Sequence, residues 1–290
     1  MRAREADAHG SVVVDDLEFG FEVHGDRAPT ILLMPTWTII HSRFWKFQIP
    51  YLARRNRVVS YDGPGNGRSP RTTDPTAYAV DAFVDRAAAV LDATDTQEAV
   101  IVGYSDGGKM AAAFAGAHPD RTLGVVMIAP ALQVREVPPL PERAVIAENF
   151  HKPYPPSPTS WEKYNSAYWS DHYEDFLHFF FSEIFTETYT TKAEDDCVGW
   201  GLETNGAVLT AEALRPPDPD HHEVIAAIKA PTLVIHGTED HLVPFEAGRR
   251  LAEMTGGEFA AFHGTGHAPH IKEPVRFNLV LRDFIERISP

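Results

Sequence analysis

The chain has 290 residues, of which 43% are hydrophobic and 23% charged, a composition typical of a globular protein with a large buried core. A formal net charge of -15 argues against nucleic acid and against an anionic membrane surface as partners. The single cysteine, Cys197, excludes an internal disulfide and argues against a cysteine-based zinc site, and the absence of a signal-peptide core or a long apolar run predicts a cytoplasmic location.

The first 130 residues predict strands and helices in alternation. Two short runs, 11–14 and 19–24, flank Asp15-Asp16 and predict a hairpin at a sheet edge. Further strands are expected at 30–34, 57–61, 99–102 and 124–129, and helices at 44–54, 81–91 and 109–114. These strands are continuously apolar, so they need cover on both faces, which indicates an α/β fold with a mostly parallel sheet.

The alternation stops between residues 131 and 222. This stretch is rich in proline at both ends, and it contains a helix-like, strongly aromatic segment over 161–185 and one or two further helices over 194–214. The strand and helix rhythm then resumes. We therefore expect a core formed by residues 1–130 and 223–290 and a helical cap formed by residues 131–222, placed over the strand ends where such sheets bind ligands.

The segment between the strand at 99–102 and the helix at 109–114 carries the pattern G-x-S-x-G. A serine in a sharp strand-to-helix turn has a strained backbone, and the residues two before and two after it must be small. Gly103 and Gly107 meet that need. The turn would expose the hydroxyl of Ser105 and place the N–H of Asp106 at a helix N-terminus, where an oxyanion is stabilised.

An activated serine needs a histidine base and a carboxylate that orients the histidine. Asp240 follows the strand PTLVIHG and His267 follows the strand FAAF, so both lie in loops at the same sheet edge as Ser105. The order Ser, Asp, His is the order expected for this architecture. Glu239 is the alternative acid, and the alternative bases are His263 and His270.

Together, the stretches GYSDGG, DGPGNGRS, GTEDHLVP and GTGHAPHIKEP resemble those of the α/β-hydrolase superfamily over residues 19–289. The resemblance implies a doubly wound eight-stranded sheet, with Ser105 as nucleophile, Asp240 as acid and His267 as base, and no cofactor. The segments 35–54 and 197–204 are similar to an actinobacterial-type subset related to hydrolase domains that are sometimes fused to nucleotide-cyclase modules. The resemblance does not identify a natural substrate.

Two positions depart from the family's pattern. The usual His-Gly after the third strand is replaced by Pro35-Thr36-Trp37, and proline cannot donate a hydrogen bond. We expect the N–H of Trp37 to complete the oxyanion hole with that of Asp106, and the N–H of Thr38 is the alternative. Asp106 itself stands where an uncharged residue is usual, and its carboxylate could point into the site or away from it.

The sequence thus predicts a hydrolase that cleaves an ester, thioester or lactone-like carbonyl through an acyl-enzyme. Its substrate would be a small, partly apolar molecule, with Thr38, His41, Tyr104, Trp169 and Trp200 as candidate contacts. The cap aromatics could equally form the core of the cap. Within the enzyme class, carbon-carbon bond hydrolysis and cofactor-free peroxidation stay open. The alternative outside that class is a ligand-binding or sensor protein with slow or no turnover. The oligomeric state is not predicted.

Overall fold

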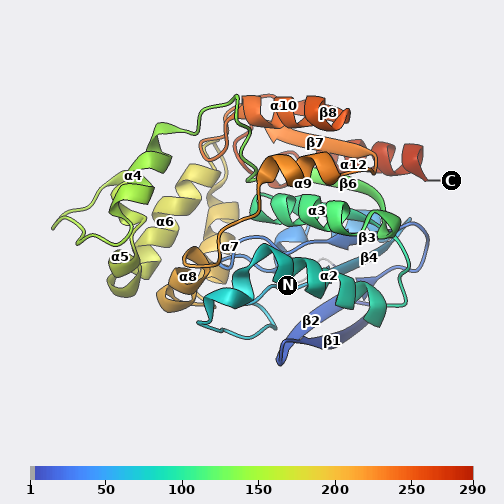
Figure 1. Cartoon of the computed structure of the whole chain (residues 1–290), viewed down its shortest axis with the longest axis horizontal. Coiled ribbons are helices and arrows are strands. Elements are labelled where there is room, and N and C mark those ends of the chain that lie inside the picture. Colours follow the sequence, from blue (N-terminus) through green and yellow to red (C-terminus); the bar gives the residue numbers. More distant parts are fainter. Residues whose placement is uncertain (1–3, 290) are drawn as a thin grey trace.

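The computed structural model describes residues 4–289, except for the side chains of residues 143–145, and its centre is one twisted sheet (Figure 1). Within those residues the sheet has eight strands in the order β1-β2-β4-β3-β5-β6-β7-β8. The hairpin strands pair antiparallel with each other and with β4, and all other pairs are parallel. The strands are β1 (Ala8–Val14), β2 (Leu17–His24), β3 (Thr30–Leu33), β4 (Arg57–Tyr61), β5 (Ala99–Tyr104), β6 (Thr122–Ile128), β7 (Thr232–Gly237) and β8 (Glu258–Phe262).

Helices cover both faces of the sheet, as the continuous apolar strands predict. Along β5, Val100 and Val102 belong to one apolar cluster and Ile101 to the other, because successive side chains point to opposite faces. One face packs against α2 (Val80–Ala93), α3 (Asp106–Ala117), α9 (His221–Ala227) and α10 (Phe245–Thr255), and the other packs against α1 (Ile49–Leu52) and α12 (Pro274–Ile288). The doubly wound fold class is confirmed.

Between β6 and β7 the chain forms a group of helices to one side of the sheet (Figure 1). They are α4 (Pro141–Asn149), α5 (Ser166–Asp171), α6 (Tyr173–Ile184), α7 (Thr191–Gly201) and α8 (Gly206–Ala213). Trp169, Phe176 and Phe181 are fully buried among them, and Cys197 is buried as well. The next helix, α9, packs on α3 of the core. The division into a cap at 131–222 and a core at 1–130 and 223–290 stays a prediction, and residues 1–3 and 290 lie outside the described residues.

Three expected helices are interrupted, each for a local reason. The helix expected over 44–54 is a 3₁₀ turn (Ser42–Trp45) followed by α1, because Pro50 lacks an N–H and is accommodated in the first turn of a new helix. The segment 161–185 breaks where the side chain of Asn165 caps α5. The terminal helix that the sequence predicts over 271–288 is likewise divided at Pro274 into α11 (Pro269–Lys272) and α12.

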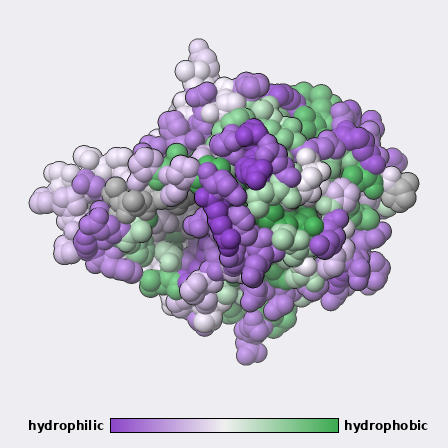
Figure 2. All heavy atoms as spheres, turned by 45° about the horizontal axis from the view of Figure 1, so that its top comes forward, coloured by the Kyte–Doolittle hydropathy of each residue, from purple (hydrophilic) through white to green (hydrophobic). Residues whose placement is uncertain are grey.

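The exposed surface is mainly hydrophilic on the face shown in Figure 2, where apolar residues form small separate patches. The large apolar side chains that are exposed, such as Val13, Tyr189 and Val275, come from distant parts of the chain. Isolated apolar residues of this kind are ordinary on a protein surface. Among residues 4–289, no helix has the length and apolar character needed to cross a membrane.

Candidate active site

The turn between β5 and α3 holds Ser105 in a strained conformation, with φ 53° and ψ -117°. Both glycines of the pattern are required by close packing. A Cβ on Gly103 would lie 1.9 Å from the carbonyl oxygen of Gly107, and a Cβ on Gly107 would lie 2.4 Å from the carbonyl oxygen of Pro35. The backbone therefore turns sharply at Ser105, which presents its hydroxyl at the end of the central strand.

Ser105, His267 and Asp240 form one chain of hydrogen bonds. The Nε2 atom of His267 lies 2.8 Å from the Oγ of Ser105, and its Nδ1 lies 2.7 Å from the Oδ2 of Asp240. Because an ionised carboxylate only accepts, Nδ1 carries the proton and Nε2 is the acceptor for the hydroxyl of Ser105. This is the geometry and tautomer that a general base requires.

The carboxylate of Asp240 is fully supplied with hydrogen-bond donors. Its Oδ1 accepts from the N–H groups of Leu242 (2.8 Å) and Val243 (3.0 Å), and its Oδ2 accepts from His267 and also from His236 Nε2 at 2.9 Å. Burial acts to raise the pKa of Asp240, but the electrostatic attraction of His267 and the hydrogen bonds from both histidines hold that pKa well below its usual range. Asp240 is therefore ionised at neutral pH.

His236 must donate from Nε2, because this atom faces two acceptors, Asp240 Oδ2 and the carbonyl oxygen of Val243 at 3.2 Å. The ring is completely buried, and a Cβ on Gly248 would lie 2.2 Å from its Nδ1. His236 thus has one fitted orientation, and it holds the same carboxylate oxygen of Asp240 that bonds to His267.

The alternative acid and bases lie elsewhere. Glu239 and His263 are exposed. His270 is completely buried among aromatic rings, including Phe44 and Tyr104, and burial holds its pKa well below its ordinary value. None of the three is hydrogen-bonded to Ser105 in the described structure.

The backbone N–H groups of Trp37 and Asp106 have no hydrogen-bond acceptor among residues 4–289. The N–H of Thr38, the alternative donor, is already bonded to the carboxyl Oε2 of Glu212 at 3.1 Å. The structure therefore favours Trp37 over Thr38 as the partner of Asp106 in an oxyanion hole.

The side chain of Asp106 is held by two cations. Arg215 contacts both of its oxygens, at 2.8 and 3.1 Å, and Lys109 contacts Oδ1 at 2.8 Å. Burial acts to raise the pKa of Asp106, but Lys109 and Arg215 outweigh it and bring that pKa to about 2. The question of its direction is thus answered: the carboxylate pairs with Arg215 and Lys109, and its charge is balanced there.

Several of the predicted substrate contacts are buried packing residues. Tyr104 is 1% exposed, its ring lies against His267, and burial raises the pKa of its phenol well above the ordinary value. Trp169 has no exposed surface at all, and Thr38 is buried with its hydroxyl donating to the carbonyl of Pro64. A substrate could reach Trp169 only after the cap helices had moved.

Trp37 lies between the core and the cap aromatics. Its ring stacks on Tyr164 with centroids 5.9 Å apart and meets Phe180 edge-on at 4.6 Å. The loop that carries the candidate oxyanion donor is therefore packed directly against the helices that cover it.

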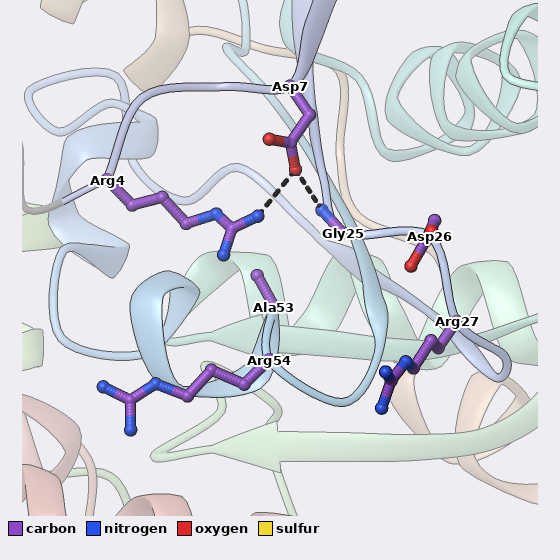
Figure 3. Close-up of a pocket in the computed structure, with 7 residues that line it drawn as sticks. All are labelled: Arg4, Asp7, Gly25, Asp26, Arg27, Ala53 and Arg54. Carbon is purple, nitrogen blue, oxygen red and sulfur yellow. Dashed lines mark hydrogen bonds and ion pairs between the residues drawn. The ribbon is translucent and has the colours of Figure 1, made fainter.

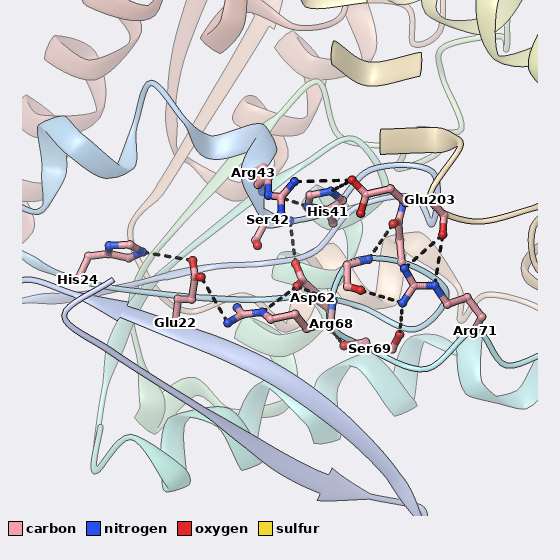
Figure 4. Close-up of polar contacts among 12 residues, drawn as sticks. Glu22, His24, His41, Ser42, Arg43, Asp62, Arg68, Ser69, Arg71 and Glu203 are labelled. Carbon is pink, nitrogen blue, oxygen red and sulfur yellow. Dashed lines mark hydrogen bonds and ion pairs between the residues drawn. The ribbon is translucent and has the colours of Figure 1, made fainter. Parts of the chain in front are cut away.

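His41 and Trp200 sit together at the seam between the cap and the core, with ring centroids 5.6 Å apart. Figure 4 shows Glu203, just after α7, pointing at His41 and Arg43, with contacts of 3.5 and 3.6 Å. Burial lowers the pKa of His41, which favours the neutral ring. Asp62, at the centre of the same figure, accepts from the N–H of Ser42 at 2.9 Å.

Three functional candidates escaped the sequence reasoning: His236, Glu212 and Arg215. His236 lies within the strand PTLVIHG, next to the glycine before the acid's turn, and a polar residue in a buried strand was a signal that could have found it. Glu212 and Arg215 carry no such signal, because charged residues near a proline-rich connection are ordinary in sequence.

An open pocket of about 600 Å³ lies between the first described residues, the end of β2 and the residues that follow α1 (Figure 3). It is lined by Arg4, Asp7, Gly25, Asp26, Arg27, Ala53 and Arg54. Asp7 bonds to Arg4 and to the N–H of Gly25, which ties the first described residues to the end of β2. None of the predicted site residues lines this pocket.

Residues 29–274 match the model of the alpha/beta hydrolase fold family. The 2-hydroxymuconate semialdehyde hydrolase of Pseudomonas sp. (strain CF600) is 28% identical over 83% of this chain and 80% of its own length. The bifunctional esterase/perhydrolase of Acinetobacter calcoaceticus is 26% identical over 93% of this chain and 97% of its own.

Among solved structures, the enol-lactonase of Burkholderia xenovorans LB400 matches with a TM-score of 0.73 at 22% identity, covering 96% of this chain and 100% of the other. That likeness shows the fold. Because the family model spans most of the sequence and the sheet order agrees with it, this chain is a member of the α/β-hydrolase family.

Proposed function

We propose that the protein is a serine hydrolase that cleaves an ester, thioester or lactone-like bond through an acyl-enzyme. The observation that carries the proposal is the hydrogen-bonded chain from Ser105 through His267 to Asp240, with the serine in a strained turn. Relatives named as an esterase/perhydrolase and a semialdehyde hydrolase agree with hydrolytic chemistry at a carbonyl.

In the first half of the reaction, Ser105 Oγ attacks the carbonyl carbon as its proton passes to His267 Nε2. The carbonyl oxygen becomes an oxyanion, which the N–H groups of Trp37 and Asp106 bind. His267 then gives its proton to the leaving oxygen or sulfur, the carbon–heteroatom bond breaks, and the acyl group stays on the serine. Asp240 stabilises the imidazolium through Nδ1 and is not itself protonated.

In the second half, His267 takes a proton from water as the water oxygen attacks the acyl carbon. The second tetrahedral oxyanion occupies the same two N–H groups. When it collapses, His267 returns its proton to Ser105 Oγ, and the acid is released. Every proton is carried by His267, so these steps use no cofactor.

The aromatic residues above the site support a substrate that is partly apolar. Trp37 and Trp200 are partly exposed, unlike Trp169, and they lie on loops and helices that meet at the seam of the cap. We propose these two rings as substrate contacts. Carbon-carbon bond hydrolysis is the second candidate, and the relative that is a 2-hydroxymuconate semialdehyde hydrolase supports it.

The test is steady-state hydrolysis of p-nitrophenyl esters of increasing acyl length, of thioesters, of lactones and of a vinylogous 1,5-diketone, by the wild type and by Ser105→Ala. Sustained turnover of an oxoester, thioester or lactone that Ser105→Ala loses by about 10³-fold or more would support the proposal. Turnover of the diketone alone would move the carbon-carbon hydrolase ahead. A burst equal to the enzyme concentration without further turnover would favour a sensor.

A further inference from the structure

We propose that the segment from Glu212 to Asp218, at the end of α8, is a clamp that positions both halves of the oxyanion hole. Glu212 and Arg215 are its two positioning residues, one for each donor. The inference rests on the proposed function, since it assigns a role only if Trp37 and Asp106 bind an oxyanion. It accounts for both departures from the family's pattern, namely Pro35-Thr36-Trp37 after the third strand and Asp106 after the nucleophile.

The first half of the clamp fixes the loop after β3. The carboxyl Oε2 of Glu212 accepts the N–H of Thr38 at 3.1 Å, directly beside Trp37, and Glu212 is 1% exposed. The same loop and α8 also pack closely on the turn at Gly65, because a Cβ on Gly65 would lie 2.7 Å from Thr38 and 2.8 Å from Val208 of α8. Pro35 and Trp37 thus take their positions from α8 as well as from the sheet.

The second half fixes the first residue of α3. The guanidinium of Arg215 grips the carboxylate of Asp106 through two nitrogens, at 2.8 and 3.1 Å. A two-point bond of this kind sets the orientation of both groups as well as their separation. Because Asp106 contributes the second N–H, the direction of that N–H is tied to the same short segment that holds Thr38.

The remaining charges close the cluster. Lys109 bonds to Asp106 and to Asp218, at 2.8 and 2.6 Å, and Arg215 lies 3.4 Å from Asp218. Two cations therefore face two aspartates. These four charges sum to zero, and Glu212 is not counted among them. A buried arrangement with balanced charge and satisfied donors has one preferred geometry, and loss of one partner leaves an uncompensated charge.

The consequence is a link between cap position and catalysis. Glu212 belongs to α8, Arg215 and Asp218 to the connection that leads into α9, and Thr38 and Asp106 to the core. If α8 moves away from the core, both hydrogen-bond sets are strained at once. The oxyanion hole is complete only when the end of α8 is packed against the core, whatever the substrate.

The first experiment compares Glu212→Leu with Glu212→Gln. Leucine removes the acceptor for the Thr38 N–H, whereas glutamine keeps an acceptor oxygen of the same reach. On the best substrate of the wild type, Glu212→Leu is expected to lower kcat by about tenfold or more with little change in KM, and Glu212→Gln to retain most of it. A merely structural role would not produce this split between kcat and KM.

The second experiment applies a double-mutant cycle to Arg215→Gln and Asp106→Asn. Each single variant is expected to lower kcat about tenfold, and the double variant should cost little more than the worse single one, since both remove one contact. The control is Arg135→Gln. Arg135 lies 2.7 Å from Asp220, which belongs to the same connection as Arg215, and this arginine–aspartate pair is exposed. The control variant should leave kcat unchanged.

The clamp is overturned if folded Glu212→Leu and Arg215→Gln both keep kcat within threefold of the wild type, or if kcat and KM change by the same factor. If Glu212→Leu does not fold, Arg215→Lys decides: an ammonium lacks the planar pair of nitrogens with which Arg215 bonds both oxygens of Asp106 side by side, so a wild-type kcat in that folded variant would refute the clamp. Failure of the proposed function is distinguishable, because the wild type itself would then show no turnover that depends on Ser105.

Discussion

Asp240 and Glu212 are both buried carboxyl groups near the same serine, but their surroundings drive them to opposite states. Asp240 accepts four hydrogen bonds, two from backbone N–H groups and two from histidines, and its pKa lies well below the usual range. Glu212 accepts one, from the N–H of Thr38; within the described residues its Oε1 has no hydrogen-bond partner and lies 3.9 Å from Nη1 of Arg215. Burial raises the pKa of Glu212 to about 8, although Arg215 acts to lower it.

The difference shows that burial alone does not decide whether a carboxyl is ionised. The number of donors aimed at its oxygens decides, together with the charges facing it. For Asp240 the result is a fixed negative charge that can stabilise a protonated imidazole. For Glu212 the result is a largely neutral group at pH 7, which can hold the loop of Trp37 without placing a negative charge beside an oxyanion.

The largest effect is expected when the charge of Asp240 is removed. Asparagine keeps the size of the side chain, but its amide can turn the imidazole of His267 into the wrong tautomer. We expect Asp240→Asn to lower kcat by about 10³- to 10⁴-fold, measured on the best ester substrate. The matched control is Glu239→Gln at the exposed neighbour. Similar losses in both variants would contradict the assignment of Asp240.

A smaller effect is expected from removing one of the four donors. His236→Leu deletes the bond to Asp240 Oδ2, and a hydrogen bond to a charged group contributes about 1.5–3 kcal/mol, so kcat should fall about 10- to 100-fold. His236→Gln can place an amide nitrogen near the position of Nε2 and should recover part of the loss. If His236→Leu is fully active and as stable as the wild type, the second histidine does not support the acid.

The raised pKa of Glu212 gives a pH dependence of stability. Between its ordinary value of 4.5 and about 8, the folded state keeps a proton that the unfolded state has released. The free energy of unfolding therefore falls as pH rises through this window, by at most about 1.4 kcal/mol per pH unit from this group. Denaturant unfolding of the wild type and Glu212→Gln at pH 5 to 9 should show the difference.

The surroundings of Glu212 are the same in the wild type and in Glu212→Gln. Arg215, Asp106, Tyr78 and Tyr173 are the charged or titratable groups whose electrostatic effects couple to Glu212, and all are present in both proteins. Subtracting the two pH profiles isolates the carboxyl. A difference that stays flat, or that favours the wild type increasingly above pH 5, would show that Glu212 is ionised in the folded state at neutral pH.

The smallest effect is expected at Glu203, a carboxylate whose side chain is 39% exposed and which faces His41 and Arg43. Solvent screens such pairs, so Glu203→Gln should change the free energy of unfolding by less than about 1 kcal/mol. Thermal or denaturant unfolding measures this directly. A loss of several kcal/mol would mean that the seam in Figure 4 holds the cap far more strongly than its exposure allows.

Sequence reasoning reached the sheet, the strained serine and the residues of the hydrogen-bonded chain, because each depends on local signals. Glycines on both sides of Ser105, apolar strands and the order Ser, Asp, His are visible along the chain. Helix breaks at Pro50 and Pro274 were missed, although proline chemistry contains the reason.

The contacts that hold the site residues in place could not be predicted from such local signals. The bonds from Glu212 to Thr38 and from Arg215 to Asp106 join residues 174 and 109 positions apart, and no local pattern specifies them. The direction of the Asp106 side chain could not be predicted because it depends on Arg215, which is distant in the sequence. Trp169 shows the converse: its aromatic character suggested a substrate wall, whereas the fold buries it completely.

The most direct test of the central claim is the intact mass of the protein after a fluorophosphonate probe, with the wild type and Ser105→Ala treated in parallel. Such probes react with a serine that a neighbouring base has activated. The account predicts a single adduct on the wild type and none on the variant. A folded wild type without an adduct, or an equal adduct on both proteins, would contradict the claim that His267 and Asp240 activate Ser105.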